Sequence, residues 1–138
     1  MEETFANWPK SKPAGWSYHN MASGYKDAAA PVSFDATGDA MTTYDLGGEI
    51  SSVSFHAAGH SISNSTSTLT VVGIGADNTE MVLATLGAAD IGQTAAGIDR
   101  TYSVPAGVRR IAWRYTKDKG GVGVGSVVIE GAGFSTPR

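Results

Sequence analysis

The 138-residue sequence contains no cysteine, few charged residues and no long apolar run. The absence of cysteine excludes disulfides, thiolate nucleophiles and thiolate metal sites. Charged residues make up 17% of the chain and the formal net charge is -3, which argues against binding to a nucleic-acid backbone. No apolar stretch approaches the roughly 20 residues that a membrane-spanning helix needs. We therefore expect neither nucleic acid nor an inserted membrane segment among the partners.

Segments of alternating apolar and polar residues, separated by short turns, run through most of the chain. In residues 49–57, for example, Val53, Phe55 and Ala57 share one face. No segment gives a convincing amphipathic helix, and two longer loops are expected at residues 7–15 and 87–99. The pattern predicts an antiparallel β-sandwich or barrel. The other strands are expected at residues 4–6, 16–19, 31–34, 41–44, 68–74, 80–86, 102–104, 108–115 and 122–130.

Glycine is abundant, with 18 residues, and alternates with other residues near the end of the chain. The run from Gly120 to Gly125 lacks the Gly-Lys-Ser/Thr ending and the following helix of a phosphate-binding loop. Glycines inside a strand permit a bulge or a close approach of another backbone. We therefore expect these glycines to serve geometry rather than phosphate binding.

Several motifs resemble those of jelly-roll modules in secreted bacterial proteins, namely the cleaved-adhesin, MAM-like and choice-of-anchor modules. Residues 3–9 and 13–16 are similar to the start of these modules, and residues 37–42 to their Gly-Asn-Ala-Leu segment. Residues 110–117 resemble the arginine-aromatic-lysine strand before their closing strand. The resemblance implies an all-β, antiparallel two-sheet sandwich of the jelly-roll type. It also implies that residues 1–138 are one module of a larger secreted or cell-surface bacterial protein.

The resemblance also implies a structural calcium site. Many such modules hold the ion with an N-terminal glutamate, an acidic residue near the Gly-Asn segment and an Asp-Asp pair in the closing strand. Glu3 and Asp39 match the first two positions, whereas Gly125 and Ser126 stand in place of the pair. Calcium takes about six to eight oxygen ligands, usually with several carboxylates. The expectation of calcium at Glu3 and Asp39 is weakened accordingly, and no other cofactor is expected.

No residue pattern indicates catalysis. His56 and His60 lie four residues apart on an expected strand, so their backbones are about 13 Å apart. That separation is too great for one metal ion, and we expect both imidazoles to face solvent at the strand end. There is no Gly-x-Ser-x-Gly motif, and no pair of carboxylates is singled out by its context. We therefore expect a protein that is not an enzyme.

Aromatic and polar side chains give a better basis for binding carbohydrate. Sugars stack their C–H faces on exposed rings and need polar partners for their hydroxyls. The alternation places Trp113 and Tyr115 in the core, and the resemblance implies the same for Trp16. Trp8, in a polar loop, is either exposed or covers one end of the sandwich. The candidate ligand-binding residues are Trp8, Trp16, Tyr18, His19, Asn20, Tyr25, Arg110, Arg114 and Lys117.

Two arginines of the strand expected at residues 108–115 form a separate candidate. Arg110 and Arg114 share a face, where they can receive an acidic sugar or another carboxylate. The alternative is that each pairs with an acidic residue of a neighbouring strand.

Two functions follow from these observations. The first is a non-catalytic carbohydrate-binding module of a larger protein, with a glycan as its partner. The second is a structural or adhesive module without a sugar site, whose partners are a surface protein or neighbouring domains of the parent chain. A row of exposed aromatic rings favours the first, whereas a polar surface above a buried Trp8 and Trp16 favours the second.

Overall fold

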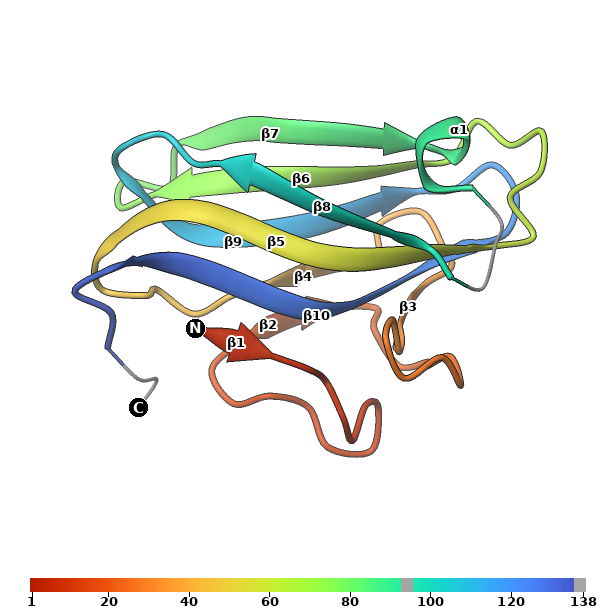
Figure 1. Ribbon diagram of the computed structural model, residues 1–138, viewed down its shortest axis with the longest axis horizontal. Coiled ribbons are helices and arrows are strands. Elements are labelled where there is room, and N and C mark those ends of the chain that lie inside the picture. Colours follow the sequence, from red (N-terminus) through yellow and green to blue (C-terminus); the bar gives the residue numbers. More distant parts are fainter. Residues whose placement is uncertain (93–95, 136–138) are drawn as a thin grey trace.

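Two antiparallel five-stranded sheets face each other and form a β-sandwich (Figure 1). The computed structural model describes residues 1–92 and 96–135. In sheet A, the order is β1-β10-β5-β8, and β3 also pairs with β10. Its strands are β1 (Glu2–Glu3), β3 (Val32–Phe34), β5 (Glu49–His60), β8 (Ile98–Ser103) and β10 (Gly121–Ala132).

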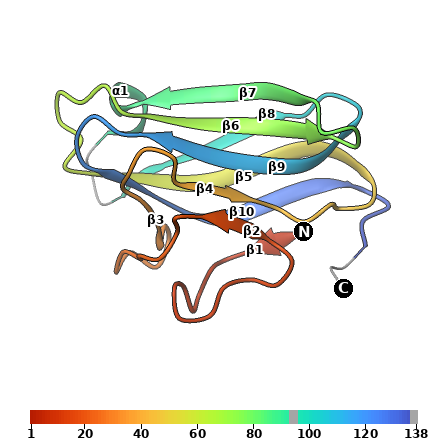
Figure 2. The same cartoon turned by 180° about the vertical axis from the view of Figure 1, so that it is seen from behind.

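Sheet B forms the second layer, which Figure 2 shows from the opposite side. Its strand order is β2-β4-β9-β6-β7. One short helix, α1 (Ala88–Ile91), follows β7, and no helix of the described residues is long and apolar enough to cross a membrane. The strands are β2 (Ser17–His19), β4 (Ala40–Thr42), β6 (Thr68–Gly75), β7 (Glu80–Gly87) and β9 (Val108–Thr116).

The predicted fold class is confirmed, but several predicted boundaries are wrong. The first strand is Glu2–Glu3 and not residues 4–6, because Phe5 adopts a φ of 56° and buries its ring in the core. The loop expected at residues 87–99 contains the helix α1 and the start of β8. Alternation is weak at each of these positions, so the local pattern alone did not reveal them.

The core between the sheets is rich in aromatic rings. Trp113 of β9 is fully buried, stacks on Trp16 with ring centroids 6.0 Å apart, and meets Phe55 of β5 edge-on at 5.9 Å. Tyr115 is 2% exposed, so the predicted core positions of Trp16, Trp113 and Tyr115 are confirmed. Offset and edge-on ring pairs of this kind add to the stability gained from burial.

The glycines of β10 allow a loop to lie flat on the outer face of sheet A. A β-carbon at Gly121 would overlap the Tyr25 hydroxyl, and one at Gly123 or Gly125 would overlap a backbone oxygen of the segment 29–30. The strand also has a register irregularity between Gly125 and Val128. The prediction that these glycines serve close packing and a bulge is therefore confirmed.

Candidate functional site

The outer face of sheet B gathers several of the predicted binding residues. Cross-strand register places Ser17 beside Thr42 and Ala112, and it places His19 beside Ala40 and Arg114. Residues paired across an antiparallel sheet point to the same side. The intervening Tyr18, Met41 and Trp113 point inward and pack in the core. We call this surface the sheet B face; its accessible residues are Ser17, His19, Ala40, Thr42, Arg110 and Arg114, whereas Ala112 is fully buried.

The two arginines of β9 differ in their partners. Arg114 donates two hydrogen bonds to the Glu80 carboxylate, at 2.8 and 2.5 Å, and so forms a bidentate ion pair. These bonds hold the pKa of Glu80 below its ordinary value. Arg110 instead donates to the amide oxygen of Asn78 in the turn between β6 and β7. Arg114 therefore has an acidic partner, as expected, but Glu80 lies on β7, one strand beyond the neighbouring β6. For Arg110 the expectation of an acidic partner is wrong.

A polar depression lies at one end of the sheet B face, beside Arg110. Its volume is about 420 Å³, and it is lined by the start of β2, the segment after β4, the β6–β7 turn and β9. Thr43 is buried beneath the depression, and two hydrogen bonds to Ile111 hold it in place. Its backbone N–H donates to the Ile111 carbonyl, and its hydroxyl accepts from the Ile111 N–H. We call this depression the end groove; its lining residues are Gly15, Ser17, Thr43, Tyr44, Asp45, Gly75, Ala76, Asn78 and Arg110.

Sequence reasoning found Arg110 but missed the other polar groups of the end groove. Tyr44, Asp45 and Asn78 lie on two segments that are more than 30 positions apart in the sequence. Only the order of strands in sheet B brings them together. The turn at Asp77-Asn78 is visible in the sequence, but its proximity to Arg110 is not.

The N-terminal aromatic residues come together, but they do so inside the protein. Trp8 and Trp16 are 7% and 8% exposed, so the alternative of an exposed Trp8 is wrong and the covering one is confirmed. The Trp8 indole N–H donates to the Ser23 carbonyl at 2.7 Å, and its ring lies 5.2 Å from that of Tyr18. The Lys12 ammonium lies 5.4 Å from the Trp8 ring centroid. These rings therefore offer no open platform for a sugar.

Three further candidates lie at the opposite end of the sheet B face from the end groove. His19 is exposed, and the Asn20 amide donates to Asp39 Oδ1 at 2.9 Å. Lys117 is exposed, and its backbone N–H donates to the Thr37 hydroxyl. Only His19 of these three belongs to the sheet B face. Asn20 holds the loop structure around Asp39 instead.

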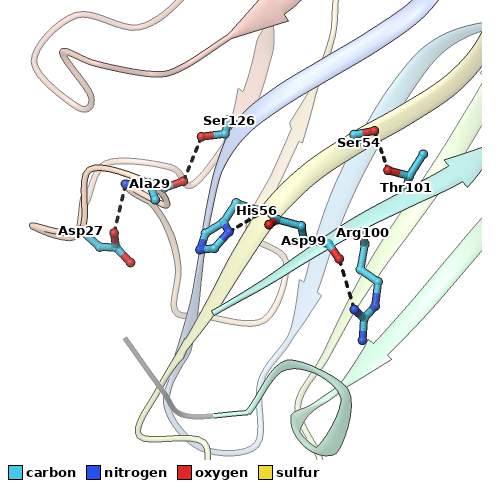
Figure 3. Close-up of polar contacts among 8 residues, drawn as sticks. All are labelled: Asp27, Ala29, Ser54, His56, Asp99, Arg100, Thr101 and Ser126. Atoms are coloured by element: carbon cyan, nitrogen blue, oxygen red, sulfur yellow. Dashed lines mark hydrogen bonds and ion pairs between the residues drawn. The ribbon is translucent and has the colours of Figure 1, made fainter. Parts of the chain in front are cut away.

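Tyr25 belongs to a loop that covers part of sheet A, close to His60. The sequence predicts that His56 and His60 face solvent. However, the Tyr25 ring stacks on His60, and the His56 side chain is only 13% exposed. The Nδ1 atom of His56 lies 2.9 Å from the Asp99 carboxylate, a contact that Figure 3 shows. The expectation of solvent-facing histidines is therefore wrong, because the loop that carries Tyr25 and Asp27 lies over this part of sheet A.

The residues suggested for calcium do not fit that ion. Asp39 is fully buried, and its carboxylate accepts three hydrogen bonds, from the Asn20 amide and from the backbone N–H groups of Asp35 and Ala36. The Glu3 carboxylate accepts the Phe5 N–H. Within residues 1–92 and 96–135, no group of three or more acidic or histidine side chains is arranged to hold a metal ion. Calcium needs several free oxygens, which these residues do not supply.

The two sheets and their strand order define a jelly-roll sandwich, and comparison with solved structures confirms this class. The K1 cleaved adhesin domain of Lys-gingipain from Porphyromonas gingivalis W83 has a TM-score of 0.69 at 17% identity, over 96% of this chain and 98% of that domain. CBM29_1, a family 29 carbohydrate-binding module from Piromyces equi, has a TM-score of 0.58 at 10% identity, over 86% of this chain and 83% of that one.

A third similar structure is the CBM32 of AlyQ in complex with 4,5-unsaturated mannuronic acid. Its TM-score is 0.54 at 15% identity, over 88% of this chain and 97% of that one. The sequence matches no protein-family model, and no curated protein matches it. The resemblance to cleaved-adhesin modules is therefore confirmed at the level of the fold.

Proposed function

We propose that this chain is a non-catalytic carbohydrate-binding module of a secreted or surface bacterial protein, and that it binds glycans on the sheet B face. The observation that carries the proposal is the end groove, where hydroxyl, amide and guanidinium groups from four segments converge in one depression. Sugar hydroxyls need such donors and acceptors in a fixed arrangement. Two of the similar folds belong to carbohydrate-binding modules, which supports the same reading.

The proposed binding differs from ring stacking on tryptophan. Trp8 and Trp16 are buried, so affinity must come mainly from hydrogen bonds at the end groove. His19 is the exposed ring of the sheet B face and can extend the contact along the sheet. Such a site predicts modest affinity for a single sugar and tighter binding to a longer chain that crosses several strands.

A steric block tests the location of the site. Ser17 is exposed and lines the end groove, so Ser17→Phe should fill the depression and abolish binding on a glycan array. Ser103→Phe is the matched control, because Ser103 is also exposed on an edge strand but belongs to sheet A. Absence of binding by the unaltered protein across plant, algal and host glycans would overturn the proposal. Equal binding by both variants would overturn the location.

The second candidate function is adhesion to a protein, which the burial of Trp8 and Trp16 favours. The similar cleaved adhesin domain supports it as well. Treatment of target cells distinguishes the two candidates. Loss of binding after periodate oxidation of the cell-surface sugars supports the glycan, whereas loss after protease treatment alone supports the protein.

A further inference from the structure

One guanidinium of the sheet B face has no carboxylate partner in the described part of the chain. Among the described residues, the arginine that pairs with a carboxylate is Arg114, whose partner is Glu80. Arg110 uses one N–H donor on the Asn78 amide oxygen, and a guanidinium has five such donors. Arg110 therefore holds a positive charge and unused donors at the edge of the end groove.

The other groups of the end groove limit the charge of a ligand. Asp45 contributes the one carboxylate of the lining, and its Oδ1 accepts the Gly47 N–H at 2.8 Å. Arg110 is the one cation of this lining that can receive a negative group, and the Asp45 carboxylate disfavours a ligand with further negative charges nearby. Ser17, Tyr44 and Asn78 add hydroxyl and amide groups that can bind neutral hydroxyls.

We propose that the end groove recognises a sugar that carries a carboxylate, that is, a hexuronate unit of a polysaccharide. Arg110 receives the carboxylate, because the planar guanidinium matches two carboxylate oxygens with two parallel N–H donors. Ser17, Tyr44 and Asn78 then bind hydroxyls of the sugar ring. This inference rests on the proposed function, since it names the class of glycan that the same site takes.

The direct test compares an acid with its ester. Oligogalacturonate and its methyl ester have the same sugar ring and linkage, and they differ only in whether the carboxylate is free. Titration calorimetry should show binding of the acid, at least about tenfold weaker binding of the ester, and weakening of the acid complex as salt is raised. Two further probes complete the set. One is an oligomannuronate, and the other is a sulfated oligosaccharide whose sugars carry no carboxylate.

Two variants assign the effect to Arg110. Arg110→Gln removes the charge and should weaken binding of the acid at least about tenfold. Asn78→Asp places a carboxylate next to Arg110, where it should compete with the ligand to a similar extent, as Glu80 occupies Arg114. Arg109→Gln is the matched control, because it removes the same charge from a neighbouring residue outside the lining, and it should change affinity less than about twofold. Unchanged melting temperatures show that the variants are folded.

The outcomes separate this inference from the proposed function. Binding of the acid that is lost in Arg110→Gln and Asn78→Asp but retained in Arg109→Gln supports the inference. Equal binding of the acid and its ester overturns the inference and leaves the proposed function standing, and so does binding of the sulfated oligosaccharide alone. Equal weakening by Arg109→Gln also overturns it, because the effect is then one of net charge. Binding to none of these probes and to no glycan on the array overturns both.

Discussion

The ring of Tyr25 lies stacked on the imidazole of His60, with centroids 3.7 Å apart and planes inclined by 19°. This contact joins the loop over sheet A to the end of β5. The Nε2 atom of His60 is buried and has no hydrogen-bond partner among the described residues. Burial lowers the pKa of His60 from its ordinary value of 6.5, while the nearby Asp27 carboxylate opposes that shift.

Stability should therefore depend on pH through His60. Because the pKa is lowered in the folded protein, the unfolded chain takes up the proton first as the pH falls. The contribution of neutral His60 is complete above about pH 6.5 and is lost as the pH falls from there through the lowered folded pKa. Denaturant unfolding between pH 8 and 4 should show the unaltered protein losing stability relative to His60→Gln across this window. Parallel pH curves for the two proteins would refute the role of His60.

The close approach of the loop to β10 gives a second prediction. Gly123→Ala should destabilise the fold by about 1–3 kcal/mol, because the added β-carbon overlaps the Ala30 carbonyl oxygen, which is backbone and cannot rotate away. Gly87→Ala is the control, since its nearest neighbour would be the Asp90 carboxylate at 3.7 Å. We expect the control to change stability by less than about 0.5 kcal/mol in urea unfolding. Equal effects of the two substitutions would contradict this account.

The buried Asp39 carboxylate gives a third prediction. Its three hydrogen bonds tie Asn20, Asp35 and Ala36 together. Asp39→Ala should cost about 3–5 kcal/mol, because the donors lose a charged acceptor in a buried place. Asp35→Asn alters an exposed side chain of the same loop and should cost less than about 0.5 kcal/mol.

The third prediction extends to calcium, because it concerns the same carboxylate. Because the Asp39 oxygens already accept three donors, addition of calcium or of EDTA should leave the melting temperature unchanged. Thermal melts of EDTA-treated protein with and without millimolar calcium check this directly. A rise in melting temperature that depends on calcium concentration would show that another set of oxygens binds the ion.

The sequence predicts the sandwich better than it predicts the site, and particular residues show why. Ile111, Trp113 and Tyr115 occupy every second position of one strand, so that strand reveals its core-facing side without knowledge of the rest. Trp8 lies in a loop with no such period, and only the position of Ser23 and Tyr18 in space shows that its ring is covered. Long-range proximity of this kind is a property of the strand order.

The partners of the arginines illustrate the same limit. Glu80 and Asn78 lie more than 30 positions before the arginines in the sequence. Glu80 begins β7, Asn78 lies in the turn before it, and β6 separates β7 from β9. The sequence predicted that Arg110 and Arg114 share a face, which the register confirms through the pairs Ile74–Arg110 and Thr70–Arg114. It did not predict that one arginine has a carboxylate partner and the other an amide.

The burial of Trp8 gives a fourth prediction. Trp8→Ala should destabilise the fold by about 3–5 kcal/mol, through loss of packing against Phe5 and Tyr18 and of the hydrogen bond to Ser23. Trp8→Phe keeps most of the packing and should cost less. If Trp8→Phe is folded and binds glycan as the unaltered protein does, the ring serves the fold. Loss of binding by folded Trp8→Phe would instead place Trp8 in the ligand site.

The ion pair between Arg114 and Glu80 gives a fifth prediction, which follows from the proposed uronate site. Both side chains are about half exposed, at 41% and 50%, so Glu80→Gln should change stability by no more than about 1 kcal/mol. It should also release the Arg114 guanidinium on the same face as Arg110, because an amide is a weaker acceptor than a carboxylate. Binding of oligogalacturonate should then tighten several-fold, with a steeper dependence on salt. Glu49→Gln is the control, because it makes the same change in net charge on sheet A and should leave the affinity unaltered. Equal tightening by both variants would show that the effect comes from overall charge and not from Arg114.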